Sequence, residues 1–131
     1  MQLRAVGVVR SRLTEREGAP KQGCEGAPEA WVEFDAAVAD AVEGIAAGDE
    51  LLVLTWLDRA DRDVLRVHPR DDLSRPQQGV FTTRSSDRPN PIGLHCVRVL
   101  EADGLRLRVA DLEALDGTPV VDVKPPLRGE R

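Results

Sequence analysis

The sequence contains no tyrosine, and its other bulky aromatic residues are only two tryptophans and two phenylalanines. A tyrosine hydroxyl is therefore excluded from any mechanism, and the core has to be built mainly from Val, Leu, Ile and Ala. Cys24 and Cys96 are too few for a disulfide framework or a four-cysteine zinc site. His68 and His95 have no metal-ligand spacing to either cysteine, so the sequence predicts no metal site.

Long apolar runs are absent as well. No run approaches the roughly 18–20 residues of a membrane span, and the N-terminus does not resemble a signal peptide. We therefore expect a cytoplasmic protein without a membrane segment. With 131 residues, of which 41% are hydrophobic, the chain has the size and apolar content of a single domain over residues 1–131.

The net charge of −5 argues against nucleic-acid binding driven by the overall charge of the chain. The charge is unevenly distributed, because residues 59–88 contain seven arginines and five aspartates. This segment is interpreted either as solvated loops with local Asp–Arg pairs or as a binding region for an anionic ligand or RNA.

Short apolar or alternating runs, separated by turns rich in Gly, Pro and Asp, predict many strands. The predicted strands are residues 3–9, 31–34, 50–57, 64–67, 79–83, 94–100, 105–109 and 120–123. Within them, Phe81 is expected to be buried, and His95 and Arg98 are expected on the polar side of their strand.

One helix is predicted after the N-cap candidate Asp35, because apolar residues recur there at helical spacing. Together with the short strands, it indicates a mainly β protein: a small β-barrel with one accessory α-helix at about residues 35–45. The order does not match the regular βα alternation of a Rossmann fold.

The loop over residues 79–93 is the first candidate for chemistry. Two prolines stiffen it, and Arg84 and Arg88 place two guanidinium groups within five residues. Such groups bind a carboxylate or phosphate through paired hydrogen bonds. The alternative is a structural loop in which the arginines pair with Asp87 and other carboxylates.

The second candidate is the segment 112–125, in which Asp122 lies inside an apolar strand. A buried carboxylate needs a partner or a function, and Lys124 is the structural alternative. The third is the loop 19–23, which carries a cation and an amide and is a weak signal by itself.

Four blocks of sequence together resemble one family. They are APKQG (19–23), ELLVLTWLDRA (50–60), GVFTTRSSDRPNPIGL (79–94) and LEALDGTPVVDVKP (112–125). They are similar to the TsaA-like or YaeB family, whose characterised bacterial members are S-adenosylmethionine-dependent tRNA methyltransferases. The resemblance implies a non-Rossmann β-barrel, a homodimer, and N6-methylation of threonylcarbamoyl-adenosine next to the anticodon of tRNA.

The resemblance also implies which residues hold the methyl donor, S-adenosylmethionine. Carried over position by position, they are Pro20, Lys21, Gln22, Asp58, Arg59, Arg84, Leu94, Glu113, Ala114, Leu115 and Asp116. Arg84 suits the carboxylate of the donor, and Glu113 or Asp116 suits its ammonium or adenine amine. An exocyclic amine must also lose a proton, and Asp122 and Asp58 are the candidate catalytic residues, with water as the alternative.

The sequence departs from the family at two positions. Asp58 stands where a histidine is usual, and Pro126 stands where an aromatic residue is common. Longer members also carry a further C-terminal domain. Two alternatives to a tRNA methyltransferase therefore stay open: a methyltransferase for a small-molecule acceptor, and a non-catalytic S-adenosylmethionine-binding module.

Overall fold

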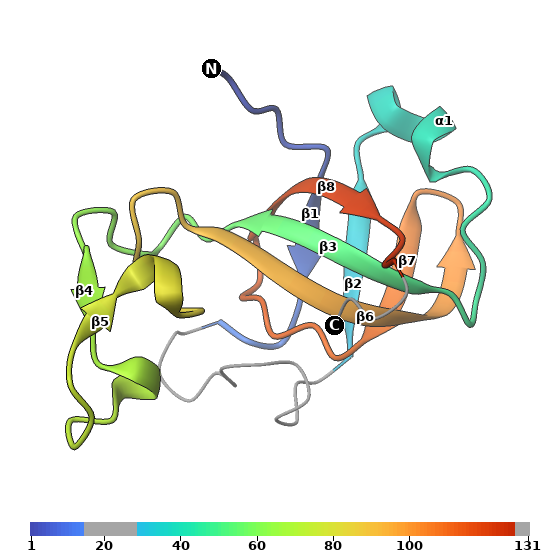
Figure 1. Cartoon of the computed structure of the whole chain (residues 1–131). Coiled ribbons are helices and arrows are strands. Elements are labelled where there is room, and N and C mark those ends of the chain that lie inside the picture. The colour runs from blue at the N-terminus through green and yellow to red at the C-terminus, as the bar shows by residue number, and fades with distance from the viewer. Residues whose placement is uncertain (15–28, 128–131) are drawn as a thin grey trace.

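The computed structural model describes residues 1–14 and 29–127. Within these residues, six antiparallel strands close into a barrel in the order β1-β2-β7-β6-β3-β8 (Figure 1). Their bounds are β1 (Gly7–Arg10), β2 (Ala30–Phe34), β3 (Glu50–Trp56), β6 (Ile92–Asp103), β7 (Arg106–Ala110) and β8 (Pro119–Lys124). The small β-barrel predicted from the short strands is confirmed.

The barrel is filled by small and branched side chains. The largest fully buried ones are leucines and valines, among them Leu107, Leu112 and Val53, and no aromatic residue belongs to the buried cluster of the described chain. Inward and outward positions alternate along the strands, as the period of a β-strand requires. The core composition expected from the shortage of aromatics is confirmed.

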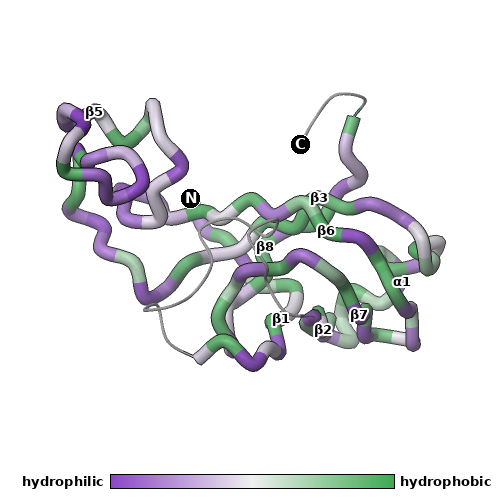
Figure 2. Tube along the Cα trace, turned by 90° about the horizontal axis from the view of Figure 1, so that it is seen from below, coloured by the Kyte–Doolittle hydropathy of each residue, from purple (hydrophilic) through white to green (hydrophobic). Residues whose placement is uncertain are grey.

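A smaller two-stranded ribbon stands apart from the barrel in both Figure 1 and Figure 2. It pairs β4 (Arg66–Val67) with β5 (Gln78–Gly79). The prediction of a strand at 79–83 is wrong, since the chain forms a 3-10 helix at Val80–Thr82 directly after β5. Val80 is buried, whereas Phe81 is 83% exposed, because the helical turn points neighbouring side chains in different directions.

The accessory helix is present but shorter than expected. A 3-10 turn at Ala36–Val38 leads into α1 (Ala39–Val42), and Asp35 begins it as predicted by accepting a hydrogen bond from the Ala37 N–H at 3.3 Å. The backbone turns extended at Glu43, and the next residue, Gly44, has a φ of 95° that favours glycine.

Candidate functional site

A chain of three polar side chains runs inside one end of the barrel. His95 Nε2 lies 2.7 Å from the Thr55 hydroxyl, and His95 Nδ1 lies 2.6 Å from Glu113 Oε1. Thr55 and His95 are 0% and 4% exposed, and the Glu113 side chain is 11% exposed. The chain therefore leads from the core to a carboxylate just below the surface.

The fold explains how these side chains meet. Thr55 of β3 pairs with Gly93 of β6, and His95 follows two residues later on the same inward face. A β-bulge between Leu54 and Thr55 interrupts the pairing of β3 with β8 at this level. Bulges often occur beside functional sites, where they redirect a side chain.

Gly93 lets the polar chain come close to the backbone of β6. A Cβ atom at this position would lie 2.4 Å from Thr55 Oγ1 and 2.7 Å from His95 Nε2. The glycine of the PNPIG block is thus required by packing against the hydroxyl and the imidazole.

The inward position of His95 corrects the sequence interpretation. Both faces of residues 94–100 carry apolar residues, so the alternation alone did not decide which face is buried. Val97 and Val99 have the same parity as His95 and are buried, whereas Leu94 and Arg98 are exposed. The β-branched residues Val97 and Val99, which alternate with the same period as His95, could have indicated the buried face.

The loop between β7 and β8 is tied to the segment that follows β1. The Asp116 carboxylate accepts a hydrogen bond from the Ser11 N–H at 3.0 Å, and the Asp116 N–H donates to the Leu13 carbonyl at 2.6 Å. Leu112 and Ala114 are buried on either side of Glu113 and anchor the loop to the core. The turn 113–116 is thereby held in a defined place.

A third segment joins the same place from the end of β3. The Arg59 guanidinium donates to the Thr14 carbonyl at 2.7 Å, so residues 11–14 contact both Arg59 and the 113–116 turn. Asp58, the neighbour of Arg59, is exposed. The predicted donor residues Pro20, Lys21 and Gln22 come shortly after Thr14 in sequence and lie outside the described residues.

The loop 79–93, which carries Arg84 and Arg88, is hydrogen-bonded to the segment that follows Arg59. The Asp61 N–H donates to the Asp87 carboxylate at 2.9 Å, and the Arg88 N–H donates to the Asp61 carbonyl at 3.0 Å. The Arg88 guanidinium also donates to the Val80 and Thr83 carbonyls, so this arginine stiffens the loop. Arg84 remains exposed on the fastened loop.

These contacts connect some of the segments that carry predicted donor residues. Residues 11–14 bond to both Arg59 and the 113–116 turn, and the loop bearing Arg84 bonds to Asp61, two positions after Arg59. Asp58 takes part in none of these bonds and is only the chain neighbour of Arg59. Leu94 takes no part in these bonds and lies on the face of β6 opposite His95, where the residue is 41% exposed. Ala114 is buried in the core, and its side chain supports the turn from within.

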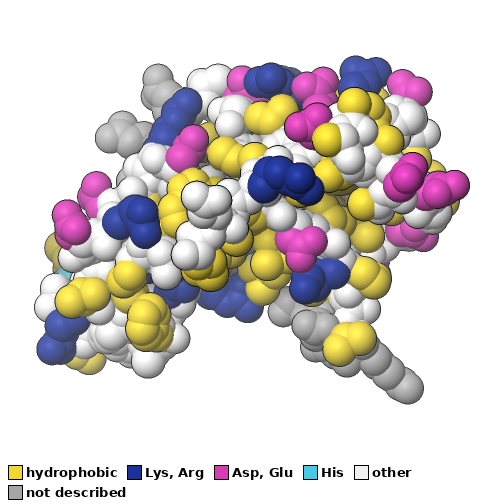
Figure 3. Space-filling view, turned by 90° about the horizontal axis from the view of Figure 1, so that it is seen from above, with side chains coloured by type: hydrophobic (Ala, Val, Ile, Leu, Met, Phe, Trp, Pro, Cys, Tyr) yellow, Lys and Arg dark blue, Asp and Glu magenta, His cyan; other side chains and the backbone are white. Residues whose placement is uncertain are grey.

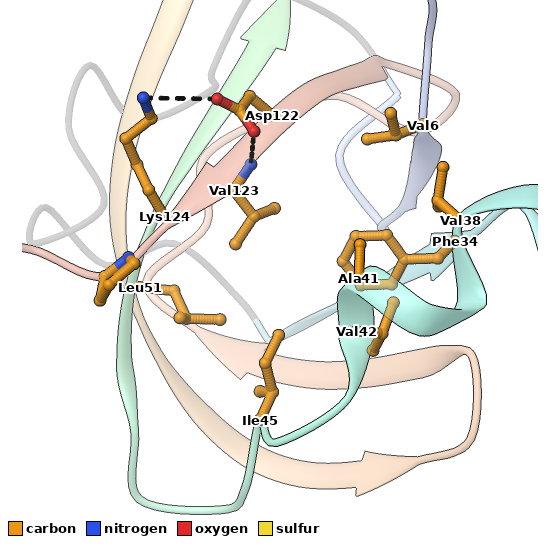
Figure 4. Close-up of a pocket in the computed structure, with 11 residues that line it drawn as sticks. Val6, Phe34, Val38, Ala41, Val42, Ile45, Leu51, Asp122, Val123 and Lys124 are labelled. Carbon is orange, nitrogen blue, oxygen red and sulfur yellow. Dashed lines mark hydrogen bonds and ion pairs between the residues drawn. The ribbon is translucent and has the colours of Figure 1, made fainter.

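Asp122 differs from the expectation of a buried carboxylate. Its side chain is 56% exposed and pairs with Lys124 Nζ at 3.5 Å, which is the structural alternative foreseen for it. Figure 4 shows this pair at the rim of an apolar cavity of 210 Å³ beside α1, into which Phe34 and Ile45 project.

A larger cavity of 420 Å³ lies on another part of the barrel. Its described lining residues are Met1, Leu3, Ala5, Trp56, Arg62, Asn90, Ile92, Pro119 and Val121. The Arg62 guanidinium lies 5.1 Å from the Trp56 ring and donates to the Pro89 carbonyl. None of the predicted donor residues is among these nine.

Residues 1–14 and 29–127 contain no group of three or more His, Cys, Asp or Glu side chains placed to hold a metal ion. No helix within the same ranges is long and apolar enough to cross a membrane.

The tie between the 113–116 turn and the segment after β1 leads to a prediction. We expect Asp116→Ala to lower the free energy of unfolding by about 1–2 kcal/mol, because the Ser11 N–H loses its partner. Chemical denaturation measures this loss. Asp103→Ala is the matched control, since that exposed carboxylate makes only a surface ion pair with Arg106 and should change stability very little. Equal losses for both variants would contradict the tie.

Comparison with known proteins identifies the family. A family model described as the tRNA-methyltransferase O N-terminal domain matches residues 8–129. The chain belongs to this family. A relative from Archaeoglobus fulgidus named "Probable S-adenosyl-L-methionine-binding protein" is 50% identical over 125 residues, covering 95% of this chain and 34% of that protein. Another from the same organism, named "S-adenosyl-L-methionine-binding protein", is 43% identical over 124 residues, covering 95% of this chain and 88% of that protein.

Solved structures from the tRNA-methyltransferase O family share the fold. The crystal structure of TrmO from Pseudomonas aeruginosa superposes with a TM-score of 0.76 and 28% identity, covering 97% of this chain and 56% of that chain. A further TrmO crystal structure gives a TM-score of 0.77 at 29% identity and covers 57% of that chain. The chain therefore spans about a third of the first relative above and little more than half of the solved TrmO chains.

Proposed function

We propose that this chain is an S-adenosylmethionine-dependent methyltransferase that N6-methylates threonylcarbamoyl-adenosine next to the anticodon of tRNA. The proposal rests chiefly on one observation: residues 11–14, the segment 59–61, the loop bearing Arg84 and the turn 113–116 are joined by hydrogen bonds although they are far apart in sequence. Family membership and the names of the relatives support the donor and the reaction class.

The charges of the joined segments fit the donor. S-adenosylmethionine supplies, when bound, a methyl group on a positively charged sulfur, and it carries an ammonium, a carboxylate and an adenine. Glu113 offers a largely buried carboxylate, which attracts a cation more strongly than an exposed one does. Arg84 offers an exposed guanidinium on a stiffened loop for the carboxylate.

The contribution of the chain to methyl transfer is chiefly positioning. Holding donor and acceptor in line supplies up to about 7–11 kcal/mol of the barrier reduction in favourable cases. A proton acceptor for the exocyclic amine is also needed. We propose Asp58 for this role because it adjoins Arg59 within the joined segments, and Asp122 is the alternative, at the rim of the cavity beside α1.

Arg84→Ala tests the carboxylate contact. Binding of S-adenosylmethionine, measured by calorimetry, is expected to weaken by about 1.5–3 kcal/mol because a charge-assisted hydrogen bond is lost. Arg66→Ala is the matched control, since it removes an exposed arginine from β4 and should leave the donor affinity as it is. Unchanged affinity in Arg84→Ala would exclude Arg84 from the donor site.

The tRNA acceptor is proposed from the ribbon and the loop beside it. Arg66, Arg70, Arg75 and Arg84 are exposed there, and Figure 3 shows exposed hydrophobic and cationic side chains side by side at this end of the molecule. Exposed arginines suit phosphates, and an exposed ring such as Phe81 suits an unstacked base.

The acceptor is tested by incubating the protein with donor and tRNA from a strain that lacks the modification. Digestion should then yield N6-methylated threonylcarbamoyl-adenosine. Failure to form this nucleoside on any tRNA, with normal donor binding, would remove the tRNA acceptor and leave the donor site standing.

A small-molecule acceptor is the second candidate, favoured by the net charge of −5. Salt distinguishes the two candidates, because binding of RNA weakens steeply with ionic strength and binding of a small neutral acceptor does not. A donor that binds tightly but is never turned over in cell extract would instead support a non-catalytic binding module.

A homodimer and a cytoplasmic location complete the proposal. Ile92 and Leu94 on the outer face of β6 are each 41% exposed and offer an apolar strip to a second copy. Sedimentation equilibrium is expected to give twice the monomer mass of 14.3 kDa.

A further inference from the structure

We propose that His95 is a positioning residue that fixes the Glu113 carboxylate for the charged groups of the methyl donor. The inference rests on the proposed function, because it concerns the donor site described there. His95 itself is 4% exposed and acts from within the barrel, through Glu113, without touching the donor.

The two contacts of His95 set the direction of the hydrogen bonds. An ionised carboxylate only accepts, so the Nδ1–H of His95 donates to Glu113 Oε1 at 2.6 Å. In the neutral imidazole, Nε2 is then an acceptor, and the Thr55 hydroxyl donates to it at 2.7 Å. The hydroxyl therefore selects the tautomer and the ring orientation that Glu113 requires.

The chain of contacts is rigid because three parts of the barrel hold it. Thr55 comes from β3, His95 from β6, and Glu113 from the loop between β7 and β8. The backbone of Gly93 packs directly against the Thr55 hydroxyl and the His95 ring, which leaves neither side chain room to move toward it. The contact engages Oε1, and a carboxylate has a second oxygen, Oε2, with which to bind a ligand.

The burial gradient argues for a functional role. Exposure rises from 0% at Thr55 through 4% at His95 to 11% at Glu113, so the polar chain ends at the turn that carries four predicted donor residues. A core filled with apolar side chains of similar volume is often as stable as a buried polar network or more stable. Stability alone therefore does not require these three residues.

Two substitutions of His95 separate its contacts. His95→Asn places an amide N–H where Nδ1 was and keeps the bond to Glu113, whereas His95→Gln reaches the position of Nε2 and keeps only the bond to Thr55. Calorimetry with S-adenosylmethionine and with its demethylated product should show about a tenfold weaker affinity for His95→Gln than for His95→Asn. His68→Gln is the matched control, with unchanged affinity, because His68 contacts a carbonyl in the distant ribbon.

A double-mutant cycle tests whether His95 acts through Glu113. In a Glu113→Gln background, the difference between the two His95 variants should disappear, because the carboxylate they position is gone. A persisting difference, or equal affinities of wild type, His95→Asn and His95→Gln, would overturn the inference. If His95→Gln does not fold, Thr55→Val takes its place, and a donor affinity equal to that of the wild type would overturn the inference.

Donor binding by the wild-type protein tests the proposed function separately from the role of His95. Wild-type protein that does not bind S-adenosylmethionine would end both claims. Wild-type protein that binds it, with no effect of the His95 variants beyond a lower melting temperature, would end only the positioning role. Nitrogen-15 NMR of the imidazole adds a readout without donor, in which the proposal requires a proton on Nδ1.

Discussion

Gly93→Ala is expected to destabilise the protein by about 3 kcal/mol. The added methyl group would lie 2.4 Å from Thr55 Oγ1 and 2.7 Å from His95 Nε2, and these two atoms are bonded to each other and buried. One of them has to move, which breaks the contact or strains β6. The gain of about 0.4–1 kcal/mol from a less flexible unfolded chain is too small to compensate.

Gly79→Ala is the matched control for this substitution. Its Cβ would meet nothing within 4 Å, and its φ of −60° is open to any residue. Denaturant unfolding should therefore show a stability equal to the wild type or slightly higher for Gly79→Ala. Similar midpoints for the two variants would mean that the close packing at Gly93 is not present in solution.

The second large effect is expected from Asp58→Asn, which should lower the rate of methyl transfer about a hundredfold. The amide has nearly the same shape as the carboxylate and does not accept a proton at neutral pH. Single-turnover kinetics with saturating donor measure the chemical step apart from donor binding, which Asp58 is also predicted to contact.

Asp122→Asn is the matched comparison and is expected to retain turnover. Its exposed pair with Lys124 should contribute less than about 0.5 kcal/mol, so stability should hardly change. The reverse order of rates, with Asp122→Asn slow and Asp58→Asn fast, would make Asp122 the proton acceptor. Equal rates in both variants would point to water.

Much of the barrel was predictable because local pattern decides it. β-Branched or alternating residues predicted strands at 50–57 and 105–109. Both strands are present within one residue of the expected bounds. The N-cap at Asp35 was predicted from its side chain and position. The absence of buried aromatics in the described core followed from the composition.

Other features depended on contacts that pattern does not encode. His95 was placed on the wrong face because both parities of its strand carry apolar residues. Phe81 was expected in the core, but a helical turn takes the place of the strand. Asp122 was expected to be buried, but the bulge in the pairing of β3 with β8 shifts the register, and Asp122 lies at the surface beside Lys124.

The candidate site shows the same division. Its residues were named from the sequence by resemblance, and the contacts between the segments that carry some of them, such as Ser11 to Asp116 across 105 positions, could not be predicted. The Thr55–His95–Glu113 contacts were missed entirely, since they join a strand residue, a residue assigned to the wrong face and a loop carboxylate.

A crystal structure of the protein grown with S-adenosylhomocysteine, the demethylated product of the donor, would show directly whether the donor binds at the turn 113–116. We expect the amino-acid end of this molecule to contact Glu113 or Asp116 and Arg84. The molecule bound instead in the apolar cavity beside α1, away from the turn 113–116, would contradict this expectation.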